Sequence, residues 1–316
     1  MTHPLPQLHR LFLTDGGLET DLIYRHGVDL PGFAAITLLA SDEGRAVLGA
    51  YFRSYLDFAR RAGTGFVLES ASWRASLDWA PQLGLAPAEL DRLNARSVEM
   101  LNALRDDYAT PATPVVVSGC IGPRGDGYDP GRIMSASEAE AYHLRQAAAL
   151  AAAGPDLLTA MTITNVSEAI GIARAAEKVG LRFVLSFTVE TDGRLPTGDG
   201  LGEAIRAVDH ATSGYPAYYM INCAHPDHFA AALAKGGGWT ARIGGIRANA
   251  SRCSHAELDV MTELDDGDPV GLAEAYRRLR AQLPKLNVLG GCCGTDQRHI
   301  EAIAAACLGA PIACAA

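Results

Sequence analysis

Long apolar runs are missing from this sequence. The first six residues have no basic flank followed by an apolar stretch, and no later segment reaches the roughly 18 uninterrupted apolar residues of a membrane-spanning helix. We therefore expect neither a signal peptide nor a membrane anchor, and we expect a cytoplasmic protein. Hydrophobic residues still make up 48% of the 316 residues, which is enough for a large buried core.

Clusters of basic residues are also missing, and the formal net charge is -9. Binding to nucleic acid requires a clustered excess of Lys and Arg that neutralises phosphates. We therefore expect small-molecule ligands and no nucleic acid partner. The expected helix surfaces carry no decisive apolar stripe, so the sequence leaves the oligomeric state open.

No linker rich in Pro, Gly or Ser divides the chain, which predicts a single domain over residues 1–316. Short apolar runs alternate with longer stretches rich in Ala, Leu, Arg and Glu, a pattern typical of a parallel sheet covered by helices. Strands are expected at 11–15, 65–69, 114–118, 156–160, 182–187, 217–222, 242–247 and 286–289. Helices are expected at 41–62, 86–105, 135–153, 167–179, 202–211, 226–234, 269–282 and 296–307.

Eight strand–helix units in a chain of this length favour an α/β fold of the (β/α)8 TIM-barrel type, with a doubly wound open sheet as the alternative. The longest irregular stretches, 121–133, 190–199 and 248–268, each follow an expected strand. In a barrel, the loops after the strands form the catalytic face, so substrate contacts are expected there.

A framework of paired cysteines is the last notable absence, because seven cysteines are an odd number in a long chain with no secretion signal. Three of them stand at strand ends: Cys223 follows the sixth expected strand, and Cys292 and Cys293 follow the eighth. In a barrel they converge on one face, where three thiolates can bind Zn²⁺ and leave a fourth position open for a substrate. Buried packing cysteines and a strained vicinal disulfide are the alternatives.

The chain resembles the zinc-dependent homocysteine S-methyltransferases, whose members use betaine, S-methylmethionine or cobalamin. Four motifs carry the resemblance: Asp15-Gly16-Gly17-Leu18-Glu19-Thr20, Gly119-Cys120-Ile121-Gly122-Pro123, Ile221-Asn222-Cys223 and Gly290-Gly291-Cys292-Cys293-Gly294-Thr295. The resemblance implies a (β/α)8 barrel, a zinc ion bound by Cys223, Cys292 and Cys293, and a thiol as methyl acceptor. The metal deprotonates that thiol, so no separate general base is required.

Further residues at strand ends are expected to contact substrate. Asp15, with Gly16 and Gly17, can form a pocket floor that attracts an ammonium group, or a plain turn capped by Asp15. Glu19 belongs to the same motif and is included with them.

Three other strand ends supply candidate contacts. Glu69 and Trp73 can hold a sulfonium or quaternary ammonium by charge and cation–π attraction, although Trp73 can equally pack in a loop. Asn222 can orient the neighbouring metal ligand or bond to backbone. Glu190 can contact a cationic ligand, whereas His255 and His299 are expected on loop or helix surfaces.

One position departs from the family pattern. Members that methylate homocysteine carry a glutamate at the end of the fourth strand, where this chain has Met161. Methionine cannot pair with the ammonium of an amino acid. Either Asp15, Glu69 or Glu190 takes over that role, or the acceptor is another thiol.

The sequence therefore predicts a zinc-dependent S-methyltransferase that moves a methyl group from an onium donor to homocysteine or a related thiol. S-methylmethionine, S-adenosylmethionine and betaine-like compounds remain possible donors. A non-catalytic zinc- or thiol-binding protein on the same barrel is the alternative. A zinc hydrolase is disfavoured because no His-x-His pair stands at a strand end.

Overall fold

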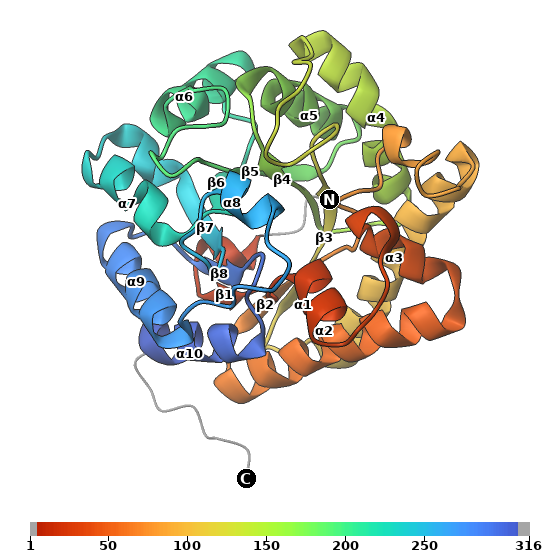
Figure 1. Ribbon diagram of the computed structural model, residues 1–316, viewed down its shortest axis with the longest axis horizontal. Helices are drawn as coiled ribbons and strands as arrows, with labels where there is room; N and C mark the ends of the chain where they lie inside the picture. Colours follow the sequence, from red (N-terminus) through yellow and green to blue (C-terminus); the bar gives the residue numbers. More distant parts are fainter. Residues whose placement is uncertain (1–4, 309–316) are drawn as a thin grey trace.

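The computed structural model describes residues 5–308, which form a closed barrel of eight parallel strands inside a ring of helices (Figure 1). The strands follow one another around the barrel in chain order. They are β1 (Phe12–Leu13), β2 (Gly65–Glu69), β3 (Val115–Ile121), β4 (Leu157–Ile163), β5 (Arg182–Phe187), β6 (Tyr218–Asn222), β7 (Ile243–Ala248) and β8 (Val288–Gly291).

Closure of the sheet distinguishes the two folds that the sequence allowed. Phe12 of β1 is paired with Gly65 of β2 on one side and with Val288 of β8 on the other. The predicted (β/α)8 barrel is therefore confirmed, and the alternative of an open doubly wound sheet is wrong. The prediction that residues 1–316 form one domain is not tested, and residues 1–4 and 309–316 lie outside the described part.

The strands are buried on both faces, as expected for a parallel barrel. One cluster of buried residues, which includes Phe12, Val116, Val184 and Met220, is contributed by strands all around the barrel. A second, larger cluster includes side chains of both strands and helices, such as Leu68 and Leu48. Burial of these apolar side chains is the main stabilising term of the fold.

The helices lie where the sequence places them, with ends that differ by at most a few residues. Ser41 and Ser135 cap two of them through hydrogen bonds to backbone N–H groups, and Pro269 occupies the first turn of a third. The long helices are α2 (Asp42–Ala62), α3 (Pro87–Tyr108), α4 (Ala136–Ala152), α5 (Val166–Lys178), α6 (Leu201–Ala211), α7 (Pro226–Ala234), α9 (Pro269–Gln282) and α10 (Gln297–Leu308).

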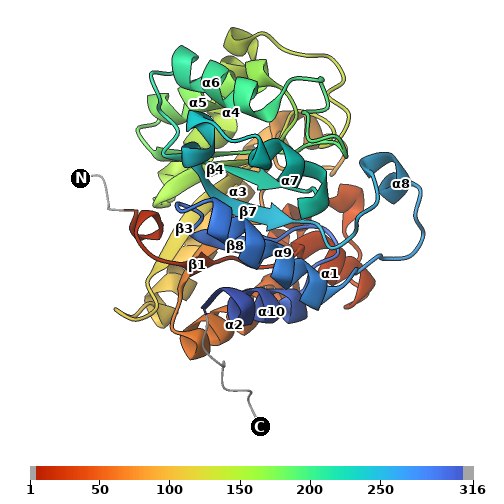
Figure 2. The same cartoon turned by 90° about the vertical axis from the view of Figure 1, so that its left-hand side faces the viewer.

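Two short helices were not predicted. Helix α1 (Leu18–Tyr24) follows β1, and α8 (His255–Asp259) lies within the stretch 248–268 that was expected to be irregular. A capping box between Ser254 and Glu257 starts α8, but five residues are too few to show a helical apolar period. Figure 2 shows α1 and α8 on the same side of the barrel, and both line one cavity there.

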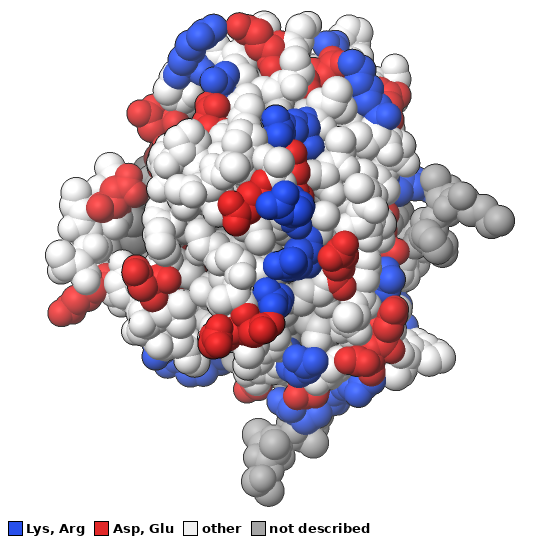
Figure 3. Space-filling model, turned by 90° about the vertical axis from the view of Figure 1, so that its right-hand side faces the viewer, with Lys and Arg blue, Asp and Glu red and all other residues white. Residues whose placement is uncertain are grey.

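Charged side chains of both signs are mixed on the face drawn in Figure 3. Ion pairs such as Arg145 of α4 with Asp91 of α3, at 2.8 Å, join neighbouring helices. This face therefore has no broad basic area of the kind that binds nucleic acid. None of the helices within residues 5–308 has the length and apolar character needed to cross a membrane.

Candidate metal and substrate site

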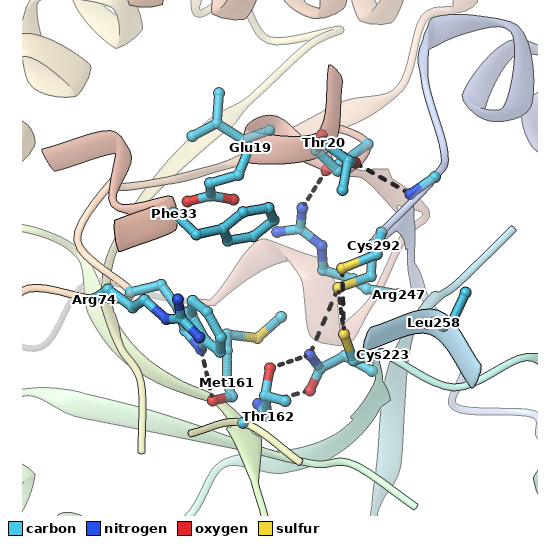
Figure 4. Close-up of a pocket in the computed structure, with 18 of the residues that line it drawn as sticks. Glu19, Thr20, Phe33, Arg74, Met161, Thr162, Cys223, Arg247, Leu258 and Cys292 are labelled. Atoms are coloured by element: carbon cyan, nitrogen blue, oxygen red, sulfur yellow. Dashed lines mark hydrogen bonds between the residues drawn. The ribbon is translucent and has the colours of Figure 1, made fainter. Parts of the chain in front are cut away.

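Three sulfur atoms meet at the carboxyl ends of β6 and β8 (Figure 4). The Sγ of Cys223 lies 3.3 Å from that of Cys292 and 3.6 Å from that of Cys293. All three lie within 4.8 Å of one another. Tetrahedral zinc with bonds of about 2.3 Å places its sulfur ligands about 3.8 Å apart, so the two distances from Cys223 need to lengthen by only a few tenths of an ångström.

The backbone at Cys223 is turned sharply to bring its sulfur into this cluster. Its φ is +57°, which is uncommon for a residue with a side chain. Two hydrogen bonds hold the turn: the Cys223 N–H donates to the Arg247 carbonyl at 3.1 Å, and His255 Nε2 donates to the Cys223 carbonyl at 2.8 Å. Such strain persists where surrounding contacts enforce it, often at functional sites.

Glycines allow the loop with the other two cysteines to pack closely. A Cβ at Gly17 would lie 2.5 Å from the Cys292 carbonyl oxygen, and a Cβ at Gly291 would overlap the side chain of Thr295. The Cys292 N–H donates to the Ala248 carbonyl at 2.8 Å. This contact ties the cysteine pair to the end of β7.

The three thiols differ in acidity. Hydrogen bonds from Cys223 and Cys293 lower the pKa of Cys292 well below its usual value. The hydrogen bond to Cys292 raises the pKa of Cys223. The hydrogen bond to Cys223 lowers the pKa of Cys293, but Cys292 and burial outweigh it and raise that pKa above its usual value. Negative charge is therefore favoured on Cys292 first, and the soft donor set of three sulfurs suits Zn²⁺ or a similar soft ion.

Asn222 connects the sulfur cluster to two neighbouring strands. Its Oδ1 accepts from Thr162 N at 2.8 Å and from Ser186 Oγ at 2.6 Å. Its Nδ2 donates to Thr162 Oγ1 at 2.7 Å and lies 3.9 Å from Cys292 Sγ. Asn222 thus combines both roles considered from the sequence, since it bonds to backbone and also faces a candidate metal ligand.

Sequence reasoning missed Tyr128, which covers the cluster from the loop after β3. Its hydroxyl lies 3.1 Å from Cys223 Sγ and 3.8 Å from Cys293 Sγ. Its ring stacks on His255 at 3.9 Å between centroids. Burial raises the pKa of Tyr128 well above its usual value, so the hydroxyl keeps its proton and can donate to sulfur. Tyr128 could not be identified from the sequence, because it lies in a glycine-rich irregular loop that has no periodic pattern of apolar residues.

The expectation that His255 and His299 are surface groups is wrong. His255 is 4% exposed, and its Nδ1 lies 3.3 Å from Glu190 Oε1. His299 is fully buried at the start of α10, beside Asp296. Both were misjudged because burial of a single histidine in a loop or at a helix start leaves no trace in local sequence.

Asp15 is already paired with a cation of the protein. Its Oδ1 lies 2.7 Å from Arg247 Nη2, and its Oδ2 accepts from the Tyr51 hydroxyl at 3.1 Å. Burial raises the pKa of Asp15, and Arg247 opposes that shift. Sequence reasoning missed Arg247, although an arginine inside an apolar strand signals a buried partner.

Glu19 and Glu69 line the cavity without an ion pair to Arg247. Burial raises the pKa of Glu19 to about 7. Glu69 is 8% exposed at the end of β2, and its Oε1 is buried with no hydrogen-bond partner among residues 5–308. Trp73 also faces the cavity; its Nε1 donates to the Met161 carbonyl at 3.3 Å, and the guanidinium of Arg74 lies 5.1 Å from its ring.

These side chains surround a cavity of about 400 Å³. All ten residues expected to form the site lie in the wall of this cavity. Glu190, which was considered as a further contact, does not. The expected residues in the wall are Asp15, Gly16, Gly17, Glu19, Glu69, Trp73, Asn222, Cys223, Cys292 and Cys293, joined by Met161, Tyr128 and Arg247. The fold and site thus define a (β/α)8-barrel protein with a three-thiol candidate metal centre in a substrate-sized cavity.

The family follows from comparison of the whole chain. The family model described as homocysteine S-methyltransferase matches residues 12–307, and the chain belongs to this family of methyltransferase enzymes. The homocysteine S-methyltransferase of Escherichia coli (strain K12) is 28% identical over 310 residues, which cover 93% of this chain and 94% of the relative. Homocysteine S-methyltransferase 4 of Zea mays is 27% identical over 317 residues, which cover 93% and 88%.

Solved structures agree on the fold. The crystal structure of the E. coli homocysteine methyltransferase MmuM in its oxidised form matches with a TM-score of 0.73 at 24% identity, covering 95% of both chains. The metallated form of the same protein matches with a TM-score of 0.72 at 24% identity, covering 94% of this chain and 96% of that one. The predicted family and enzyme class are confirmed.

Proposed function

We propose that this protein is a zinc-dependent S-methyltransferase that transfers a methyl group from a cationic donor to a small thiol. The observation that carries the proposal is the meeting of Cys223, Cys292 and Cys293 within 4.8 Å on the cavity wall. A zinc ion held by these sulfurs would deprotonate the acceptor thiol and keep it as a nucleophilic thiolate. The thiol proton leaves to solvent when the acceptor binds.

The charge of the cavity supports a cationic donor. Its wall carries seven carboxyl groups and two guanidinium groups. The acids are Asp15, Glu19, Glu69, Asp126, Asp259, Glu263 and Asp265, and the bases are Arg74 and Arg247. A sulfonium or quaternary ammonium is attracted to such a surface, and exclusion of water strengthens the attraction.

The reaction itself needs few protein groups. A new bond forms between the acceptor sulfur and the methyl carbon while the bond from that carbon to the donor heteroatom breaks. The electron pair of the broken bond stays on the donor, which becomes neutral. The protein contributes orientation: Tyr128 and Asn222 fix the sulfur cluster, and the aromatic and acidic wall holds the donor in line.

Homocysteine is the acceptor named for the curated relatives, and we propose it or a related thiol here. S-methylmethionine, S-adenosylmethionine and a betaine-like compound are the candidate donors. We also infer a cytoplasmic location, since three metal-binding thiols require a reducing compartment.

The metal site is tested by substituting one ligand. We expect the purified protein to hold about one zinc ion per chain and Cys292→Ser to lose both zinc and methyl transfer while remaining folded. Metal content by mass spectrometry and product formation from each donor with homocysteine are the measurements. Cys253→Ser, which changes a cysteine outside the cluster, is the control and should keep both.

Two results would overturn this proposal. One is full metal retention in the triple variant Cys223→Ser, Cys292→Ser, Cys293→Ser. The other is a zinc-loaded protein that leaves every candidate donor intact in the presence of thiol, as expected of a non-catalytic thiol-binding protein.

A further inference from the structure

The acid that pairs with an amino group in the family is missing at Met161, and the structure decides which other acid is free to replace it. Asp15 is bonded to Arg247 and to Tyr51. Glu190 lies beside His255 and does not belong to the cavity wall formed by the described residues. Glu69 is therefore the remaining candidate of the three acids considered from the sequence.

Glu69 has the properties of one half of a binding site. It ends β2, lines the cavity and is 8% exposed, and its Oε1 is buried without a partner among residues 5–308. A buried carboxylate with an unpaired oxygen is costly for the folded protein. Oε1 is closed off from the cavity, so an ammonium group bound there would pair with Oε2, the other oxygen of this carboxylate.

Arg247 has the properties of the other half. Its Nε donates to the Gly291 carbonyl at 2.9 Å, and its Nη2 donates to Asp15 Oδ1 at 2.7 Å and to the Gly16 carbonyl at 3.0 Å. Its Nη1 has no hydrogen-bond partner within residues 5–308, although the residue lines the cavity (Figure 4). A free guanidinium nitrogen held in place in this way suits a carboxylate.

Both halves lie on the cavity wall that carries the sulfur cluster. The Arg247 side chain bonds to Gly291, the residue before Cys292, and its backbone carbonyl accepts from Cys223 N at 3.1 Å. A small molecule bound by Arg247 and Glu69 would therefore share the cavity with the three sulfurs.

We propose that Glu69 and Arg247 form a clamp for the α-amino acid part of the acceptor, in which Glu69 binds the ammonium and Arg247 Nη1 binds the carboxylate. The clamp rests on the proposed function for its thiol, and it assigns to β2 and β7 the recognition that the family places at the end of β4. Met161, 5% exposed in the same cavity, then packs against the methylene groups of the ligand.

The test measures binding of methylated products, which need neither metal nor turnover. The probes are L-methionine, 4-(methylthio)butanoate, which lacks the amino group, and 3-(methylthio)propylamine, which lacks the carboxylate. Titration calorimetry on the metal-free and the zinc-loaded protein gives the dissociation constants. Because a charged hydrogen bond is lost, Glu69→Gln should weaken L-methionine about ten- to hundredfold and leave 4-(methylthio)butanoate unchanged.

Arg247→Lys should weaken binding of the two probes that carry a carboxylate and leave binding of 3-(methylthio)propylamine unchanged. Lysine can pair with Asp15, but it has no second nitrogen that could bind the ligand's carboxylate at the same time. Matched controls are Glu99→Gln and Arg92→Lys, which make the same chemical changes at exposed positions of α3. The double variant Glu69→Gln, Met161→Glu should regain affinity for L-methionine, because it returns a carboxylate to the cavity at the β4 position.

A purely structural role of Glu69 predicts another pattern. If Glu69→Gln weakens all three probes equally, or lowers the Tm, the clamp is wrong; removal of an unpaired buried charge should instead leave the Tm equal or higher. An effect confined to the KM of the onium donor also overturns it, because the clamp would then hold the donor. A protein that binds the probes as predicted but transfers no methyl group would contradict only the proposed function.

Discussion

Single residues at this site are tuned by the charges around them. Asp15 and Arg247 neutralise each other at the end of β1, whereas Glu19 and Glu69 have no ion pair within residues 5–308 and burial raises the pKa of both. Asp15 was expected to attract an ammonium group, but its pairing with Arg247 makes it a support for the arginine. The contribution of each acid therefore depends on its partner and cannot be read from its type alone.

Glu19 should give donor use a pH dependence near neutrality. Because burial raises the pKa of Glu19 to about 7, the group is neutral below that pH and negative above it. We expect kcat/KM for a cationic donor to rise with pH through about 7, and Glu19→Gln to flatten this limb. The measurement is kcat/KM for the donor as a function of pH at saturating thiol. If the rise near pH 7 is unchanged in Glu19→Gln, it belongs to the titration of another group.

The same shift predicts how stability depends on pH. The folded pKa of Glu19 lies above the ordinary value of 4.5, so its stabilising contribution is complete below pH 4.5 and is lost as pH rises to about 7. Glu19→Gln should therefore unfold at a higher temperature than the wild type at pH 8 but not at pH 4.

Secondary-structure elements position the site through their ends. Helix α10 starts next to the cysteine loop, where Asp296 Oδ1 accepts from Arg298 N at 2.9 Å. Arg25 at the end of α1 lies 2.9 Å from Asp296, so this one carboxylate joins the start of α10 to the end of α1, a helix that lines the cavity. Asp296 therefore both caps its own helix and contacts a residue that is far away in the sequence.

Asp296→Ala should lower the free energy of unfolding by about 1–2 kcal/mol through loss of the cap. Burial acts to raise the pKa of Asp296, but hydrogen bonds from His299 and Arg298 outweigh it and bring the pKa below its usual value. The depressed pKa means that the contribution is present above about pH 4 and is lost as pH falls further.

Urea unfolding at pH 7 and pH 3 tests this prediction. The difference between variant and wild type should shrink at pH 3. A constant difference would show that the carboxylate charge contributes nothing and that the change acts through packing alone.

The whole molecule is closed by contacts between its first and last strands, and the sulfur cluster adds a link between β6 and β8. Zinc should therefore stabilise the entire barrel, because an ion that binds only the folded state shifts the unfolding equilibrium. At a metal concentration of about 100 times the Kd, the gain is about 2.7 kcal/mol.

Removal of zinc should lower the Tm by about 5 °C, given roughly 2 °C per kcal/mol in a chain of this size. Differential scanning calorimetry before and after chelation is the measurement. The variant with Ser at positions 223, 292 and 293 is the control and should show no response to chelator. A wild-type Tm that is equally insensitive would contradict a metal bridge between the two strands.

The sequence alone determined the eight strand–helix units, favoured the barrel over an open sheet, and predicted the grouping of the cysteines. Hydrophobic runs recur at regular intervals, and strand ends in a parallel barrel share one face, so Cys223 could be placed near Cys292 although 69 positions separate them. The motif around Gly290–Thr295 added the family. These features are local or periodic, and for that reason they can be read without coordinates.

Only the tertiary structure decided which charges are free. The pairing of Asp15 with Arg247 joins residues 232 positions apart, and the contact of Tyr128 with Cys223 joins residues 95 positions apart. Neither leaves a pattern in the chain, because pairing depends on distances of a few ångströms that folding alone sets. The same distances give Asp15 an ion pair and leave Glu69 without one among residues 5–308, and so distinguish an acid that supports the barrel from one that can bind a ligand.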